Sequence, residues 1–213
     1  MTGKRRTMGE PDRIGIMGGT FDPIHYGHLF AAEEARGAAG LARVLFVPSG
    51  TPPHKRYAGM AAAEARYEMT RLAVEGNPSF GVSRIETDRR GRSYTLDTLR
   101  EIQALHPQGR IFFITGDDAV LDIMSWHEPY EIARIATLLT VGRPGYARDK
   151  ISELPQEIGR SIRTVDSPQL DISSTDIRRR VAGGRSIRYM VPESVRLYID
   201  ANGLYANSDG ELH

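Results

Sequence analysis

The residues best suited to chemistry are two histidines, His25 and His28, which follow a double glycine, Gly18-Gly19. A spacing of three residues places both imidazoles on one face of a helical turn, where they can reach the same ligand. Imidazole N–H groups can stabilise oxygen atoms that gain charge in a transition state. Pairs of ordinary, partly buried histidines share this spacing. Metal pairs share it too, but no third ligand of suitable spacing stands nearby in the sequence, and we therefore expect no metal ligation by these histidines.

The stretch around the histidines predicts a strand, a tight turn and a helix. Residues 13–17 are apolar and end at the two glycines, as in a buried parallel strand, and a helical period follows over about residues 27–39. Glycine lacks the Cβ that would hold a phosphate away from the backbone, and the N–H groups at a helix start attract anions. The turn therefore predicts a phosphate site. Neither the G-x-G-x-x-G spacing nor the P-loop lysine is present.

Composition restricts the class of protein. The chain has 213 residues, a net charge of +1 and no cysteine, which predicts a substantial core without disulfides or thiolate chemistry. The net charge gives no general reason to expect nucleic acid or a membrane as a partner. No run approaches about 18 apolar residues and no apolar leader is present, so we expect a cytoplasmic protein. Residues 1–12, with three consecutive cations at 4–6, are expected to be a flexible arm, with a nucleic-acid tail as the weaker alternative.

Strands and helices are predicted to alternate along the chain. Strands are expected at residues 13–17, 43–48, 80–85, 110–115, 136–141 and 161–165, and helices at 27–39, 61–76, 93–106, 128–135, from about 173, and between 192 and 203. Residues 144–160 give no clear pattern. No linker rich in proline, glycine or serine interrupts the chain. The fold class is therefore α/β: a single-domain, doubly wound parallel sheet of Rossmann-like topology over residues 13–205, followed by a disordered tail at 206–213.

Two helices carry more detailed predictions. The helix after residue 92 is expected to be capped by Ser93 or Thr95, and its apolar residues are expected to face the core: Leu96, Leu99, Ile102 and Leu105. The last helix is bracketed by Pro192 and Gly203, and its expected apolar face consists of Val195, Leu197, Tyr198 and Ile199.

A family resemblance rests on four stretches. The run from Gly18 to His28, Gly-Gly-Thr-Phe-Asp-Pro-Ile-His-Tyr-Gly-His, resembles the signature of the H-x-G-H nucleotidyltransferases, and in its full form that of bacterial nicotinate-nucleotide adenylyltransferases. Residues 52–55, 116–126 and 172–178 resemble the same family in the same order. The likeness implies that the chain joins ATP and nicotinate mononucleotide, forming deamido-NAD and pyrophosphate in NAD biosynthesis. It also implies Mg²⁺ brought by the ATP phosphates.

The resemblance also implies roles for individual residues. Charge at the reacting phosphates would be neutralised by His25, His28, Lys55 and Arg178. ATP would be held by Gly18, Gly19, Thr20, Phe21, Ser173, Ser174 and Thr175. The acceptor would be bound by Asp22, Thr95, Gly116, Asp118 and Trp126, with its pyridine ring stacked on the tryptophan. From residue type alone, Lys55 could be a solvated lysine, Asp118 a helix cap and Trp126 a core residue. The helix that carries Arg178 could likewise be a capped, solvated basic helix. The family usually has a small residue where this chain has Asp117, and the role of Asp117 stays open.

Other functions fit part of this pattern. One is another adenylyltransferase of the superfamily, with nicotinamide mononucleotide or a phosphopantetheine compound as acceptor. A nucleotide-binding regulator without turnover is the alternative outside enzymes, and the presence of His28, Lys55 and Arg178 argues against it because a sensor does not need charge at the α-phosphate. The sequence also allows a homo-oligomer.

Overall fold

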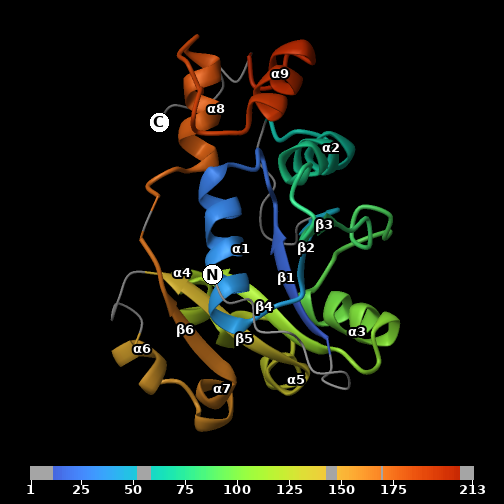
Figure 1. Ribbon diagram of the computed structural model, residues 1–213, viewed down its shortest axis with the longest axis vertical. Helices are drawn as coiled ribbons and strands as arrows, with labels where there is room; N and C mark the ends of the chain where they lie inside the picture. Colours follow the sequence, from blue (N-terminus) through green and yellow to red (C-terminus); the bar gives the residue numbers. More distant parts are fainter. Residues whose placement is uncertain (1–11, 52–58, 143–147, 169, 207–213) are drawn as a thin grey trace.

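Six parallel strands form the centre of the structure, and helices cover both faces of the sheet (Figure 1). The computed structural model describes residues 12–51, 59–142, 148–168 and 170–206. The strands lie in the order β3-β2-β1-β4-β5-β6, and every neighbouring pair is parallel. Their bounds are β1 (Arg13–Gly19), β2 (Arg43–Pro48), β3 (Phe80–Val82), β4 (Arg110–Gly116), β5 (Ala136–Gly142) and β6 (Ile162–Asp166). The predicted fold, a doubly wound α/β sheet of Rossmann-like topology, is confirmed.

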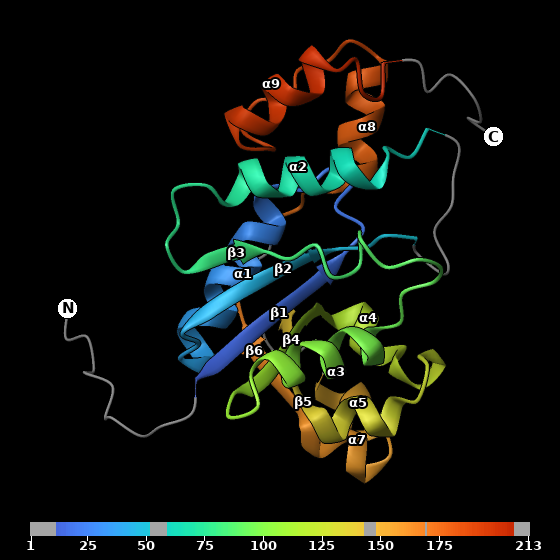
Figure 2. The same ribbon diagram turned by 90° about the vertical axis from the view of Figure 1, so that its right-hand side faces the viewer.

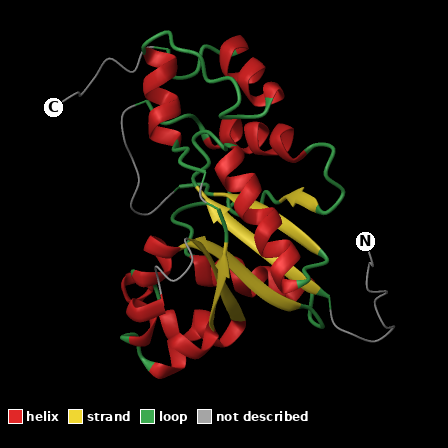
Figure 3. Ribbon diagram, turned by 60° about the vertical axis from the view of Figure 1, so that its left-hand side comes forward, coloured by secondary structure: helices red, strands yellow, loops and turns green. Residues whose placement is uncertain are grey.

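The helices alternate with the strands along the chain. They are α1 (Tyr26–Ala39), α2 (Ala63–Val74), α3 (Thr95–Leu105), α4 (Asp117–Leu121), the 3₁₀ turn η1 (Ile123–Ser125), α5 (Pro129–Ile135), α6 (Arg148–Ser152), α7 (Gln156–Ser161), α8 (Ser174–Ala182) and α9 (Glu193–Ala201). Figure 2 shows α2, α8 and α9 on one side of the sheet and α3, α5 and α7 on the other. The same layering is visible in Figure 3, with helices on both sides of the strands. Within the described ranges, no helix has the length and apolar character needed to cross a membrane.

The central strands are buried on both faces. In β1, Ile14 and Ile16 belong to the cluster under α3, α5 and α7, whereas Met17 belongs to the cluster under α1, α2, α8 and α9. In β4, Phe113 belongs to the cluster under α3, α5 and α7, and Phe112 belongs to the cluster under α1, α2, α8 and α9. Strands buried on both sides have continuous apolar runs, which is why these segments could be predicted from the sequence.

Some predicted boundaries differ from the structure. The strand expected at residues 80–85 ends at Val82, and two short helices, α6 and α7, occupy part of the stretch 144–160 that showed no pattern. Helices of one or two turns are too short to display a helical period. Apart from residues 12 and 206, the predicted arm and tail lie outside the described residues.

Two predicted core positions are wrong. Leu105 is 70% exposed, although Leu96, Leu99 and Ile102 on the same helix are buried. At about 100° per residue, each step of three residues falls about 60° short of a full turn, so Leu105 lies about 180° from Leu96. Leu197 is 53% exposed for a similar reason. It stands two residues, or about 200° of rotation, from the buried Val195 and Ile199, and so faces away from both.

The topology fixes where a ligand can bind. All strands are parallel, so their carboxyl ends meet at one edge of the sheet. The strand order changes direction between β1 and β4, and the loops that leave these two strands diverge to opposite faces and leave a crevice between them. The double glycine at the end of β1 and the segment after β4 therefore border the same space.

The contrast within α3 predicts a difference in stability. We expect Leu99→Ala to lower the free energy of unfolding by about 2–5 kcal/mol, because it removes a fully buried side chain and leaves a cavity. Leu105→Ala, on the same helix, should change it by no more than about 0.5 kcal/mol. Urea unfolding of both variants measures the difference, and equal losses would contradict the burial described for α3.

Candidate active site

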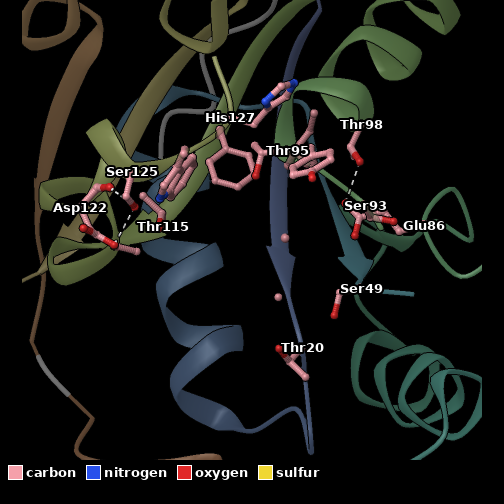
Figure 4. Close-up of a pocket in the computed structure, with 17 residues that line it drawn as sticks. Thr20, Ser49, Glu86, Ser93, Thr95, Thr98, Thr115, Asp122, Ser125 and His127 are labelled. Atoms are coloured by element: carbon pink, nitrogen blue, oxygen red, sulfur yellow. Dashed lines mark hydrogen bonds between the residues drawn. The ribbon is translucent and has the colours of Figure 1, made fainter. Parts of the chain in front are cut away.

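A cavity of about 610 Å³ opens at the carboxyl edge of the sheet (Figure 4). Its walls come from β1 and β4, from the loops after β1, β2, β3 and β4, and from the start of α3. The lining residues include Gly18, Gly19, Thr20, Ser49, Glu86, Ser93, Thr95, Thr115 and Trp126. The volume lies within the range of small-molecule sites, about 300–1,000 Å³. The walls carry both hydroxyl groups and aromatic rings, so the cavity can take a ligand that is part ring and part polar.

The turn after β1 is built around the buried side chain of Phe21. This residue has a left-handed backbone conformation, with φ of 49°, and its ring is only 2% exposed. The ring packs edge-on against His28, with centroids 5.1 Å apart. A Cβ on Gly19 would lie 2.8 Å from the Phe21 ring. The second glycine of the motif is therefore required to admit this ring, which in turn holds His28 in place.

Asp22 lies behind the turn rather than in the cavity. Its carboxyl group is 2% exposed, and Oδ1 accepts hydrogen bonds from the Tyr205 hydroxyl at 2.6 Å and the Ala61 backbone N–H at 3.2 Å. The residue does not line the cavity. In this structure the Asp22 carboxyl connects the turn to the segment after α9 and to the segment before α2.

The two histidines stack on each other at the start of α1. Their ring centroids lie 3.7 Å apart with an interplanar angle of 26°. The backbone N–H of His25 donates to Nδ1 of His28 at 3.3 Å. An imidazole nitrogen that accepts a hydrogen bond carries no proton, so the neutral His28 ring has its N–H at Nε2. A Cβ on Gly27 would lie 3.0 Å from Nδ1 of His25, which explains the glycine between the histidines.

His25 is a buried, neutral member of this pair. Its side chain is 6% exposed, and burial lowers the pKa of the His25 imidazole from its ordinary 6.5 to about 4. Nδ1 of His25 has no hydrogen-bond partner among the described residues. A neutral His25 avoids placing two like charges in stacked rings.

The start of α8 packs against the same turn. Ser173 is the N-cap of α8, and its Oγ accepts a hydrogen bond from the Asp176 backbone N–H at 3.1 Å. The neighbouring Ser174 donates from its hydroxyl to the Pro23 carbonyl at 2.8 Å. The serines predicted to bind ATP thus bring the N–H groups of a helix start beside the turn, although neither serine lines the cavity.

Arg178 reaches back from α8 to the turn. One guanidinium nitrogen donates to the Asp22 carbonyl at 2.7 Å and another to Thr175 Oγ1 at 3.3 Å. Arg180, two residues further along α8, instead forms an ion pair with Asp176 at 2.7 Å. Of these two arginines, only Arg178 touches the turn that contains the histidines.

The other end of the cavity is formed by Trp126 and the start of α3. Trp126 contacts Phe113 edge-on, with ring centroids 5.7 Å apart, and lines the cavity together with Thr95. The predicted capping of α3 is wrong, because its N-cap is Tyr94 and no side chain caps it. Ser93 stands one residue too early and turns toward the cavity, and its buried Oγ has no partner among the described residues.

The two acidic residues that follow β4, Asp117 and Asp118, have different surroundings. Gly116 is the N-cap of α4, and Asp118 on that helix is exposed; neither lines the cavity. Asp117 instead accepts a hydrogen bond from Thr140 at 2.5 Å. A Cβ on Gly142 would lie 1.6 Å from the Asp117 carboxyl. Asp117, whose role the sequence left open, therefore joins α4 to β5.

The structure thus divides the predicted site residues into groups. The cavity brings together Gly18, Gly19, Thr20, Thr95 and Trp126. Behind the glycines, the histidines, Ser174 and Arg178 gather around the turn. Lys55 lies outside the described residues. No group of three histidine or acidic side chains in the described ranges could hold a metal ion.

Two acidic residues in the cavity wall, Glu86 and Asp122, were not singled out from the sequence. Glu86 is 8% exposed, and its carboxyl group accepts a hydrogen bond from the Thr98 hydroxyl at 2.7 Å. Burial raises the pKa of this carboxyl. The signal in the sequence was the polar run 86–92, but such a run does not reveal which of its members turns inward.

Comparison with known proteins identifies the family. The model of the cytidylyltransferase-like family matches residues 16–180. A protein of Thermus thermophilus named "Probable nicotinate-nucleotide adenylyltransferase" is 52% identical over 193 residues, which is 91% of this chain and 99% of that protein. This chain belongs to the nicotinate-nucleotide adenylyltransferase family. A protein of Desulfitobacterium hafniense with the same name is 48% identical over 92% of this chain and 96% of its own length. The predicted family and enzyme class, an adenylyltransferase of NAD biosynthesis, are confirmed.

A solved structure supports the fold of the adenylyltransferase family. The Plasmodium falciparum nicotinic acid mononucleotide adenylyltransferase, complexed with NaAD, superposes with a TM-score of 0.72. The match covers 91% of this chain and 97% of the other at 20% sequence identity. At that identity the likeness establishes the shared fold.

The buried state of His25 predicts a pH dependence of stability. The unfolded chain binds a proton on this imidazole near pH 6.5, but the folded chain does so only near pH 4. The stabilisation is therefore present above pH 6.5 and is lost as the pH falls toward 4, by roughly 3 kcal/mol at about 1.4 kcal/mol per pKa unit. We expect His25→Gln to remove this part of the pH dependence, measured by urea unfolding between pH 4 and 7.5. His127→Gln, at an exposed position, is the control. A pH profile unchanged in the His25 variant would contradict the burial.

Proposed function

We propose that this chain transfers the adenylyl group of ATP to nicotinate mononucleotide and releases pyrophosphate. The observation that best supports this proposal is the cavity, which places an aromatic ring, a helix start and the glycine turn around one volume. An aromatic ring can stack a pyridine, and a helix start attracts a carboxylate. In this assignment Trp126 and Thr95 face the acceptor, and Gly18, Gly19 and Thr20 face the adenylyl group.

The proposed reaction needs alignment more than proton transfer. A 5′-phosphate oxygen of the acceptor forms a bond to the α-phosphorus of ATP, and the bond from that phosphorus to the pyrophosphate oxygen breaks with its electron pair. The nucleophile is already an anion, so no general base is required. The protein must bring two polyanions together and stabilise the charge that develops at the α-phosphate and the leaving group.

The turn and α8 supply the groups for this stabilisation. His28 presents an Nε2–H donor, by the argument from its Nδ1 bond, and we assign it to an α-phosphate oxygen. His25, neutral and buried, supports the ring of His28 and adds a second donor. Arg178 and Lys55 are assigned to the other phosphates, with Phe21, Ser173, Ser174 and Thr175 contributing backbone and hydroxyl contacts.

Mg²⁺ enters this proposal with ATP. It prefers oxygen ligands and keeps several waters, so phosphate oxygens and waters together could hold it without a cluster of protein carboxylates. Its chemistry would be to neutralise phosphate charge. We keep Asp22, Gly116 and Asp118 on the acceptor side of the proposed site. The Asp22 carboxyl already accepts two hydrogen bonds, so Asp22 would bind the acceptor through its backbone groups. The cytoplasmic location stays a prediction from the sequence, which also allows a homo-oligomer.

Acceptor preference tests the proposal directly. We expect nicotinate mononucleotide to exceed nicotinamide mononucleotide by at least about 10-fold in kcat/KM, because an amide NH₂ would face N–H donors at the start of α3. The measurement is pyrophosphate release from Mg-ATP across a panel of phosphorylated acceptors. Trp126→Ala should raise KM for both mononucleotides by the same factor, since stacking does not sense the carboxylate, and Trp126→Phe should restore much of the loss. Equal kcat/KM for the two acceptors would contradict the assignment of Thr95.

The role of His28 gives a kinetic prediction. We expect His28→Ala to lower kcat by about 100-fold or more with little change in the KM for ATP, because a donor to the α-phosphate acts chiefly in the transition state. His106→Ala is the control, since His106 lies at the end of α3 and contacts Arg43 at the start of β2. Near-normal turnover of the His28 variant would refute this role.

A further inference from the structure

Arg66 of α2 is a buried arginine whose guanidinium binds loops instead of solvent. Its side chain is 1% exposed. Nη1 donates to the Thr20 carbonyl at 2.8 Å and more weakly to Ser49 Oγ at 3.4 Å, and Nη2 donates to the Gly50 carbonyl at 3.0 Å. Nε donates to the Ala61 carbonyl at 3.1 Å. One guanidinium thus joins the loop after β1 to the loop after β2.

A third loop is attached to this pair through Gly50. A Cβ on Gly50 would lie 2.0 Å from the carbonyl oxygen of Glu86, so the two backbones are in direct contact. Thr20, Ser49 and Glu86 all line the cavity, whereas Arg66 does not. The guanidinium therefore lies behind three of the walls that a substrate would touch.

Stability alone is a weak reason to bury this arginine. Desolvating a charged group costs several kcal/mol, and the bonds described above join the Arg66 guanidinium to neutral carbonyl and hydroxyl oxygens. Arg71, on the same helix, is exposed and pairs with Glu68 at 2.7 Å. What the buried guanidinium provides is a rigid, planar set of donors that fixes carbonyl groups at set distances.

We propose that Arg66 is a positioning residue for adenylyl transfer: it sets the distance between the glycine turn, which faces the adenylyl group, and the Ser49 and Glu86 walls. This inference rests on the proposed function. The reaction joins two anions that must be in line, and a displacement of about 1 Å can cost about 100-fold in rate. Arg66 acts on the rate through the loops, without touching either substrate.

The test compares two changes on the same helix. Arg66→Lys keeps the charge but loses the planar set of donors. Thr70→Val removes a fully buried hydroxyl that donates to the Arg66 carbonyl at 2.7 Å, and so disturbs α2 without touching the loops. Both are assayed well below their unfolding midpoints for kcat, for KM of ATP and of nicotinate mononucleotide, and for thermal stability.

We expect Arg66→Lys to lower kcat by about 10- to 100-fold, with smaller changes in either KM. Thr70→Val should keep kcat within about twofold of the wild type, even if its melting temperature falls as much as that of Arg66→Lys. Wild-type kcat in Arg66→Lys, or an equal loss of kcat in Thr70→Val, would overturn the inference. A wild-type chain that transfers no adenylyl group would overturn the proposed function and this inference with it.

A second variant keeps the inference testable if Arg66→Lys does not fold. Gly50→Ala leaves the guanidinium in place, but its methyl group must displace the Glu86 carbonyl. We expect the same fall in kcat, because the relation between the loops is changed by another route. Gly37→Ala is the matched control, since a Cβ there meets no atom within 4 Å. Unchanged kcat in Gly50→Ala would overturn the inference.

Discussion

The structure depends on the hydrogen bonds that side chains from distant segments donate to the oxygen atoms of the turn after β1. This turn leaves regular structure after Gly19, so its carbonyl groups take partners from outside the sheet. Side chains from distant segments supply the donors. The bonds are Arg66 to the Thr20 carbonyl, Arg178 to the Asp22 carbonyl, Ser174 to the Pro23 carbonyl and Tyr205 to the Asp22 carboxyl.

This arrangement makes the glycine turn the meeting point of the fold. Helix α2, helix α8 and the segment after α9 all contact it, and on its other side it borders the cavity. A parallel sheet provides only the crevice at its switch point. The bonds from outside the sheet determine the shape of that crevice, so helices on one face of the sheet influence a cavity that is walled partly by α3 on the other.

In the proposed function, the site separates two physical tasks. On the cavity side, an aromatic ring and a helix start favour a flat, anionic acceptor. On the turn side, neutral donors and arginine favour phosphate oxygens. His25 illustrates why burial matters here, since its depressed pKa keeps the imidazole uncharged at neutral pH and lets it stack on His28. Arg178 serves the turn by a backbone contact and is proposed to serve the phosphates as well.

The sequence by itself determined the features that are local. Apolar runs bounded by glycine revealed the parallel strands, and the motif from Gly18 to His28 identified the family, because strand burial and turn chemistry are written in neighbouring residues. Only the tertiary structure decided the rest. Arg66 and Met69 are both buried on α2, yet nothing in the neighbouring sequence shows that Arg66 bonds to Thr20, 46 residues away. The sequence left the role of Asp117 open, and its partner Thr140 lies 23 residues away on β5. Leu105 followed the right spacing and still faced solvent, because steps of three residues drift around a helix. Hydrogen bonds and burial of this kind depend on which segments meet in space, and that is fixed by packing of the whole chain rather than by any short stretch of it.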